Sequence, residues 1–226
     1  MSFLRRSALH VAAILAVALF SAAAAQAGTL TFTDYADWVA AVSGVTTVTI
    51  PEPVNNATTG YDNFPPGGSV TYFGVVFSAN LALGEENFFN VGTGFLGLPP
   101  VLSAQGASTG VENILISLPG FVTGFALNYG TFGGSSVTFL LSNGDSVTQG
   151  SSTGSGYSVP DFFGVTDGTA FNSVLVTSPD VTGLNLNGVS YSGVSSNGVP
   201  EPAAWLLLSG GLAGLLVHGR RRSKSA

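Results

Sequence analysis

The chain has 226 residues and a formal net charge of −6, and its charges are unevenly distributed. All six basic residues and both histidines lie near the two ends, so residues 28–198 contain eleven acidic residues but no lysine, arginine, histidine or cysteine. This composition excludes nucleic-acid binding, which needs cations to displace phosphate counterions, and it excludes Ser-His-Asp, Cys-His and lysine Schiff-base catalysis.

The N-terminal segment has the pattern of a secretory signal peptide. Arg5 and Arg6 form a positive region, residues 7–20 are apolar, and Ala25-Gln26-Ala27 fits an A-x-A cleavage site. We therefore expect export through the Sec translocon and removal of residues 1–27. The alternative is an uncleaved membrane helix, which the short apolar run and the small residues after it disfavour.

A short helix is predicted near the start of the mature chain. Four residues follow the i, i+3, i+4, i+7 spacing of one helix face: Tyr35, Trp38, Val39 and Val42. Asp34 can cap this helix, and Asp37 lies in its first turn, where a carboxylate suits the helix dipole. The two aspartates could also be cation ligands, but capping is the favoured interpretation.

Short apolar runs between Gly, Pro, Asn and Ser breaks predict roughly nine or ten strands, as in a β-sandwich or barrel. In chain order they are expected at residues 29–33, 45–50, 71–78, 113–118, 121–128, 137–141, 146–149, 162–165, 173–177 and 184–191. Phe73, Val75 and Phe77 alternate onto one face of the third strand. Pro119-Gly120 should form a turn, and Asn143-Gly144 is the strongest hairpin signal.

Two long loops, residues 55–68 and 149–157, contribute to a candidate carbohydrate site. Sugar binding needs exposed aromatic rings with amide and carboxylate partners. The aromatic candidates are Tyr61, Phe64, Phe88, Phe89 and Tyr157, and the polar candidates are Asp62, Asn63, Glu85, Glu86 and Asn87. The alternative interpretation places these rings in the hydrophobic core.

The carboxylates raise two further hypotheses, glycosidic cleavage and Ca²⁺ binding. Glu85 and Glu86 are adjacent, so on a strand they would point to opposite faces and could not flank one bond. Eleven acids without an internal counter-charge repel one another, which favours divalent cations such as Ca²⁺; surface solubility is the alternative explanation. We expect no catalytic residue and no required cofactor, with Ca²⁺ as the open alternative.

The C-terminal segment, residues 199–226, is a separate unit that follows a small polar linker at residues 192–198. Val199-Pro200-Glu201-Pro202 precedes an apolar run at residues 203–217, and Arg220-Arg221-Arg222 follows it. A helix over that run spans about 22 Å, short of a ~30 Å hydrocarbon core, which suits temporary anchoring. The arginines predict a cytoplasmic C-terminus and an outer motif, in agreement with the signal peptide.

In this order and at the terminus, the three features closely resemble a PEP-CTERM sorting signal. The internal triplet Pro51-Glu52-Pro53 lacks both the apolar run and the basic cluster, so the triplet alone is a weak signal. The resemblance implies that an exosortase, a membrane cysteine transpeptidase-like enzyme of Gram-negative bacteria, recognises Pro200-Glu201-Pro202 and cuts nearby. It implies release or attachment at the cell surface, in association with exopolysaccharide and biofilm.

The central domain resembles, over residues 32–42, 72–78 and 184–191, the β-sandwich cargo often attached to such tails. This resemblance implies a jelly-roll-like β-sandwich. In many jelly-roll carbohydrate-binding modules the last strand carries an aspartate that helps to hold Ca²⁺, whereas Asn185 and Asn187 occupy that stretch here.

We therefore expect an all-β protein: a signal peptide at residues 1–27, a β-sandwich with one short N-terminal helix at residues 28–191, the linker, and a sorting tail with a transmembrane helix. The expected function is that of a non-enzymatic surface or matrix protein, anchored in the inner membrane as a precursor. A carbohydrate-binding module that contacts extracellular polysaccharide is the alternative, and a carboxylate-based glycoside hydrolase is the third hypothesis.

Overall fold

The computed structural model describes residues 28–79, 87–96, 99–106, 110–152, 156–179 and 183–193. The predicted signal peptide with Ala25 and Ala27, and the whole sorting tail, lie outside the described residues, as do Glu85 and Glu86. Within the described ranges, no helix has the length and hydropathy needed to cross a membrane.

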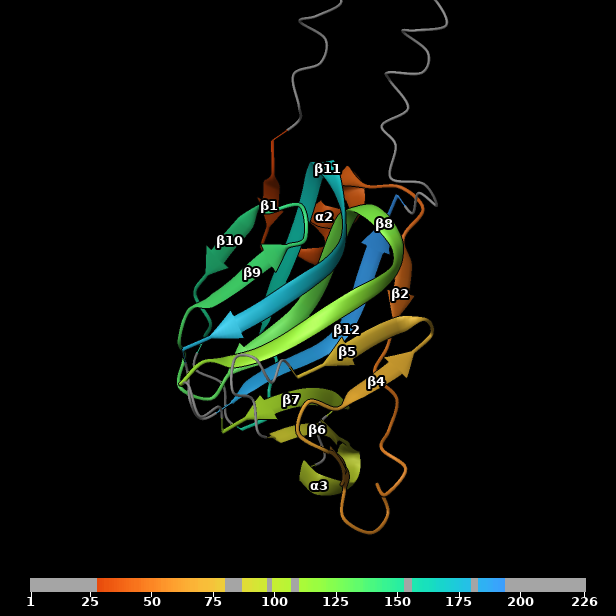
Figure 1. Cartoon of the computed structure of the whole chain (residues 1–226), viewed down its shortest axis with the longest axis vertical. Helices are drawn as coiled ribbons and strands as arrows, with labels where there is room; N and C mark the ends of the chain where they lie inside the picture. The colour runs from red at the N-terminus through yellow and green to blue at the C-terminus, as the bar shows by residue number, and fades with distance from the viewer. Residues whose placement is uncertain are drawn as a thin grey trace, which may run out of the picture. The chain divides into compact units, whose positions relative to one another are not determined.

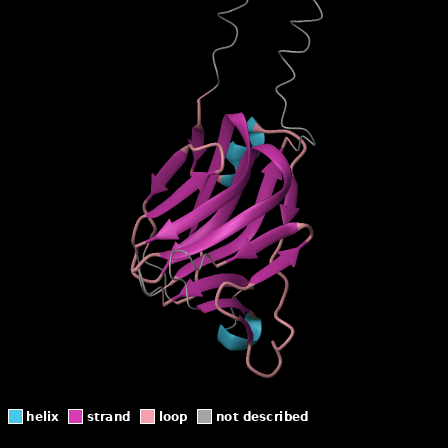
Figure 2. Ribbon diagram, viewed as in Figure 1, coloured by secondary structure: helices cyan, strands magenta, loops and turns pink. Residues whose placement is uncertain are grey.

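The described chain consists mainly of β-strands, with two short helices (Figures 1 and 2). The helices are α2 (Tyr35–Ala41) and α3 (Thr93–Leu96). The twelve strands are β1 (Leu30–Phe32), β2 (Thr46–Val48), β3 (Tyr61–Phe64), β4 (Ser69–Tyr72), β5 (Val75–Ser78), β6 (Asn87–Val91), β7 (Val101–Gln105), β8 (Glu112–Thr131), β9 (Val137–Leu141), β10 (Ser146–Gln149), β11 (Asp161–Ser178) and β12 (Leu184–Ser192).

The strands form one hydrogen-bonded sheet that folds back on itself as a two-layer β-sandwich. The long antiparallel strands β8 and β11 bend, and their halves belong to different layers (Figure 1). One layer, sheet I, runs β4-β5-β8-β11-β9-β10 and uses residues 112–118 of β8 and 173–178 of β11. The other layer, sheet II, runs β1-β11-β8-β12-β7-β6-β3, with β2 also beside β12.

The bends in β8 and β11 correct the strand count expected from the sequence. Pro119-Gly120 does not end a strand but lies inside β8, at the point where the strand passes from sheet I to sheet II. Pro119 has no N–H to donate to a neighbouring strand, which interrupts the hydrogen bonding of β8 at this point. The pairing of β8 with β11 also shifts register between Thr166 and Phe171. The segments predicted as four separate strands are therefore the halves of two long ones.

The core lies between the two sheets, as the alternating side chains require. Phe139 of β9 in sheet I stacks on Phe163 of β11 in sheet II, with ring centroids 3.7 Å apart. Tyr129 meets Phe139 edge to face at 5.2 Å. All three rings are buried, and each such side chain contributes about 1.5–3 kcal/mol through burial.

The predicted helix is present as α2, and the predicted cap is confirmed. Asp34 Oδ1 accepts hydrogen bonds from the backbone N–H groups of Ala36 (2.8 Å) and Asp37 (3.3 Å). Only Trp38 is buried, however; Tyr35 and Val39 of the expected apolar face remain exposed. Trp38 packs on the outer face of sheet II, where its Nε1 donates to the carbonyl oxygen of Val165 (3.1 Å).

Of the other local predictions, one hairpin is confirmed, and the assignments of residues 71–78 and 55–68 are corrected. The Asn143-Gly144 hairpin joins β9 to β10, with Leu140 opposite Ser146. The strand expected at residues 71–78 is instead the hairpin of β4 and β5, with Phe73 in its turn. The expected loop at residues 55–68 contains β3, and neither β6 nor β7 was predicted.

Candidate functional site

The aromatic residues selected from the sequence divide between the core and the surface. Phe88 is fully buried in the core, and the half-buried Phe64 packs against it with ring centroids 5.3 Å apart. Tyr61, Phe89 and Tyr157 lie outside this core. The alternative that placed the rings in the core is therefore correct for two residues and wrong for three.

Five side chains on the outer side of sheet II enclose a hollow of about 240 Å³, which we call the aromatic hollow: Tyr61, Phe89, Val91, Phe95 and Tyr157. Its rings meet edge to face, with the centroid of Tyr61 6.0 Å from that of Phe89 and 5.7 Å from that of Phe95. Phe95 is also 5.7 Å from Tyr157. Tyr61 and Phe95 are 37% and 43% exposed, so solvent reaches these walls.

Strands β3 and β6 place the first part of the hollow. They pair antiparallel, with Tyr61 opposite Val91 and Asn63 opposite Phe89. Because side chains alternate along a strand and Phe88 faces the core, Tyr61, Asn63 and Phe89 share the outer face. Asn63 is exposed, so its amide offers hydrogen-bond donors and an acceptor beside the rings.

Helix α3 supplies Phe95, which the sequence analysis missed. Glu52 holds the start of α3, because its carboxylate accepts hydrogen bonds from Thr93 N (3.0 Å) and Thr93 Oγ1 (2.8 Å). Gly60 has φ +79° and lies so close to the backbone of Phe95 that a Cβ would clash. Phe95 lies in a Gly-rich stretch without helical or strand periodicity, so no local signal marks it.

Asp62, a candidate sugar partner, has a structural role instead. Its carboxylate accepts hydrogen bonds from Val54 N (2.7 Å), Asn55 N (3.1 Å) and Asn55 Nδ2 (2.7 Å). These bonds fasten the segment before β3 to the strand that carries Tyr61. Of the polar candidates, Asn63 of β3 and Asn87 of β6 share the face of the rings, because Asn87 alternates with the core residue Phe88.

The loop after β10 brings Tyr157 to the hollow. The Tyr157 ring packs edge to face on Phe132 at 5.3 Å. Asn185 Nδ2 donates to the carbonyl oxygen of Gly156 (3.2 Å), which ties this loop to β12. Gly130 lies directly beneath the Ser158 carbonyl, so only a residue without a Cβ lets the loop lie this close.

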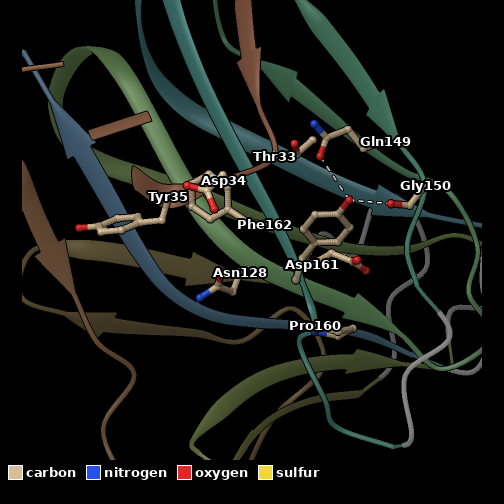
Figure 3. A pocket seen from close by; sticks show the side chains of 10 residues that line it. Thr33, Asp34, Tyr35, Asn128, Gln149, Gly150, Pro160, Asp161 and Phe162 are labelled. Carbon is tan, nitrogen blue, oxygen red and sulfur yellow. Dashed lines mark hydrogen bonds between the residues drawn. The ribbon is translucent and has the colours of Figure 1, made fainter. Parts of the chain in front are cut away.

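A second hollow of about 560 Å³ lies beside the N-terminal end of α2, and we call it the helix-side hollow (Figure 3). Tyr35, Asp34 and Phe162 group at one end of it, and Gln149, Gly150 and Asp161 group at the other. The complete lining is Thr33, Asp34, Tyr35, Asn128, Tyr129, Gln149, Gly150, Pro160, Asp161 and Phe162.

Tyr129 forms a fixed polar wall of the helix-side hollow. Its hydroxyl donates to the Gly150 carbonyl (2.7 Å) and lies 3.3 Å from Gln149 Oε1 (Figure 3). Burial and the negative charge of Asp161 raise the pKa of Tyr129 to about 12, so it stays a neutral donor. Asp161 in turn accepts hydrogen bonds from Ser152 N and Ser152 Oγ, both at 2.6 Å.

Among the residues that the structure describes, no three acidic, histidine or cysteine side chains gather into a metal-binding group. Two carboxylates do meet, because Thr29 Oγ1 lies 3.0 Å from Asp145 Oδ2 and 2.9 Å from Asp167 Oδ2. Asn185 and Asn187, which occupy the stretch of the last strand discussed above, have structural surroundings: Asn185 holds the Gly156 loop and Asn187 is half-buried. Calcium binding stays a prediction.

No family model and no curated protein matches this sequence. Solved structures show a partial similarity at low sequence identity. A mutant of the family 29 carbohydrate-binding module CBM29-2 shares 11% identity over 69% of this chain and 97% of its own, with a TM-score of 0.32. The low-affinity xylan-binding module CBM86 from Roseburia intestinalis shares 10% over 70% of this chain and 100% of its own, with a TM-score of 0.32. The catalytic domain of a GH87 α-1,3-glucanase shares 9% over 67% of this chain but 28% of its own, with a TM-score of 0.33.

Proposed function

We propose that this chain is a non-enzymatic protein exported to the cell surface or extracellular matrix, and that its β-sandwich binds glycan at the aromatic hollow. The observation that carries the proposal is the group of four aromatic rings around one hollow, two of them exposed and two half-buried, held there by two strands, a helix and a loop. Single exposed apolar residues are common on proteins, whereas clustered ones mark binding sites.

The chemistry of the hollow suits a sugar ring. Ligand sites are mostly apolar and aromatic, with a few polar groups that fix the orientation of the ligand. The C–H faces of a sugar can pack on Tyr61 and Phe95, while its hydroxyl groups reach the Asn63 amide. Pockets for drug-sized ligands measure about 300–1,000 Å³, so this smaller hollow fits one sugar ring.

The test is binding of the full chain, recovered from an expressing bacterium, to an array of polysaccharides. Tyr61→Ala and Phe95→Ala should each lower the affinity on the order of tenfold, about 1.4 kcal/mol, because each removes one wall. Phe121→Ala is the matched control, since Phe121 is 38% exposed but lies outside the hollow. Failure of the wild-type chain to bind any glycan would overturn the proposal.

The absence of catalysis is part of the proposal. The five residues around the aromatic hollow include no carboxylate, and residues 28–198 supply no histidine, cysteine or lysine to act in its place. Polysaccharides incubated with the chain should therefore show no new reducing ends. Release of reducing ends that disappears in a carboxylate variant would identify a glycoside hydrolase instead.

We also propose that an exosortase sorts this protein through its C-terminal tail, on the strength of Val199-Pro200-Glu201-Pro202, the apolar run and the arginines. Glu201→Ala should leave the chain at full length in the membrane fraction, as read by mass spectrometry. Glu52→Gln in the internal triplet is the matched control and should be processed normally. Normal processing of Glu201→Ala would remove the sorting proposal without affecting the glycan one.

A further inference from the structure

Strand register places the two hollows on one row across the outer face of sheet II. At one end, Tyr61 of β3 is opposite Val91 of β6, and Val91 is opposite Val101 of β7. At the other end, Phe162 of β11 is opposite Asn128 of β8. The aromatic hollow includes the first pair, and the helix-side hollow includes the last pair.

Strand β12 joins the two ends of this row. Asn187 of β12 is opposite Asn128. On its other side β12 pairs with β7, with Leu186 opposite Leu102, and the next step of that register sets Asn187 opposite Val101. Five strand-to-strand steps of about 4.8 Å separate Tyr61 from Phe162, so the row is about 24 Å long.

The loop after β10 connects the hollows independently of the strand register. Tyr157 lines the aromatic hollow, and Pro160 lines the helix-side hollow. These residues are three positions apart, so their Cα atoms lie at most about 11 Å from each other. Val101, in the middle of the row, is buried, so a ligand that reaches both hollows does not contact the sheet directly at that position.

The far end of the row shares exposed aromatic and amide groups with the aromatic hollow, and it adds the carboxylates of Asp34 and Asp161. Tyr35 is 48% exposed, and Phe162 supports it edge to face, with centroids 5.9 Å apart and planes at 83°. This contact fixes the orientation of an aromatic surface. Asn128 is exposed beside it, so its amide can meet sugar hydroxyl groups.

We infer that the helix-side hollow is a second glycan-binding subsite, and that one neutral polysaccharide chain lies across the strands with its sugars in both hollows. The inference rests on the proposed glycan binding and adds its ligand class, an extended chain longer than one hollow can hold. Two subsites on one chain act as linked binding modules, so the second contact forms at a high effective concentration.

The experiment compares a long and a short ligand on the full chain. The probes are neutral glucan, mannan and galactan chains and the disaccharide of each. The wild type should bind one of the long chains at least tenfold more tightly than the disaccharide. Tyr35→Ala should remove this gain and leave disaccharide affinity unchanged, because a disaccharide bound in the aromatic hollow is too short to reach Tyr35 at the other end of the ~24 Å row. Tyr61→Ala should weaken the binding of both ligands.

A second variant guards against misfolding, because Tyr35 begins α2. Asn128→Ala changes an exposed side chain in the middle of a strand, so it should reduce the gain without lowering the melting temperature. Phe121→Ala is the control away from the row and should keep the full gain. If Tyr35→Ala and Asn128→Ala both keep the gain while Tyr61→Ala loses affinity, the second subsite is wrong and the first stands. If the wild type binds no glycan, both proposals fall.

Discussion

Phe73 has an unusual backbone conformation for its residue type. It is the only non-glycine residue with positive φ (+50°) in the described part of the chain, and Gly74 after it has φ +84°. Tyr72 of β4 pairs with Val75 of β5, so Phe73 and Gly74 form the two-residue turn between these strands. Turns with two positive φ values favour Asn-Gly, and the left-handed conformation costs roughly 1–2 kcal/mol per non-glycine residue.

Phe73→Asn should therefore stabilise the fold by about 1 kcal/mol, because asparagine tolerates this conformation far better. The Phe73 ring is 78% exposed, so little burial is lost. Urea unfolding of the full chain measures the change. Phe73→Ala removes the ring but keeps the strain, so its stability should stay close to that of the wild type. Equal stabilities of the Asn and Ala variants would show that the turn is not strained.

Asp167 links stability to acid pH. Burial by itself raises the pKa of Asp167, but hydrogen bonds from Thr169 N (2.7 Å) and Thr29 Oγ1 (2.9 Å) outweigh burial and hold the pKa below its ordinary value. A depressed folded-state pKa contributes stability above the unfolded pKa of about 3.9, and this stability disappears as pH falls through the folded value.

Asp167→Asn should accordingly destabilise the protein at pH 7 and make its stability less sensitive to pH below about 4. Thr29→Val removes one of the donors and should produce a smaller change in the same direction. Unfolding free energies measured between pH 2 and pH 7 provide the comparison. A wild-type curve and an Asp167→Asn curve that stay parallel throughout the acid range would contradict this account.

The packing of α2 on sheet II depends on the contact between Trp38 and Gly164. Trp38 is fully buried, and a Cβ added to Gly164 of β11 would lie 2.9 Å from Cγ and Cδ1 of its indole ring. Glycine at this position lets the helix approach the sheet closely enough for the Trp38 N–H to reach the Val165 carbonyl. The helix has seven residues, so a single buried side chain is its main attachment.

Gly164→Ala should destabilise the fold by about 1–3 kcal/mol, because the added methyl group forces the indole or the strand to move. Gly150→Ala is the matched control: a Cβ there meets nothing within 4 Å, so it should have little effect. Chemical denaturation of both variants separates a specific clash from a general cost of replacing glycine. Equal stabilities of the two variants would show that the helix adjusts freely.

Elements with a local chemical signal were predictable from the sequence. Asp34 marked the start of α2, and Asn143-Gly144 marked the β9–β10 hairpin, because capping and tight turns depend on the residues themselves. The β4–β5 hairpin was missed because Phe73, Val75 and Phe77 imitate a continuous strand and the turn lacks an asparagine. The passage of β8 through Pro119 was missed because only the pairing with β11 distinguishes a bend from a turn.

The candidate site was predictable to a similar extent. Tyr61, Phe89 and Tyr157 were selected because they are aromatic residues in polar surroundings, and they do lie together. Phe95 was missed, and so was the helix-side hollow, because cross-strand register brings Tyr61 and Phe162 onto one row from positions about a hundred residues apart. Local sequence contains the strand period but not the order of strands in the sheet.

At the scale of the whole molecule, the charge distribution limits which glycans can bind. Residues 28–198 contain eleven acids and no base, a formal net charge of −11. Several acids accept backbone hydrogen bonds, as Asp34, Asp62 and Asp161 do, but such bonds leave the charge in place. Because residues 28–198 contain no positive side chain, a ligand that approaches the aromatic hollow meets a net negative electrostatic field from them.

This field predicts that the β-sandwich discriminates against acidic polysaccharides. Repulsion between like charges reaches about 30 Å at 0.01 M salt and about 10 Å at 0.1 M, so a polyuronate should bind poorly at low salt and better as salt is added. A neutral glycan should bind with little dependence on salt. Titrations with both polymers over this range, with EDTA present to remove bridging cations, measure the difference. Tight polyuronate binding at 0.01 M salt that weakens as salt is added would contradict this prediction. Such binding requires a cationic surface, and residues 28–198 contain no basic side chain to form one.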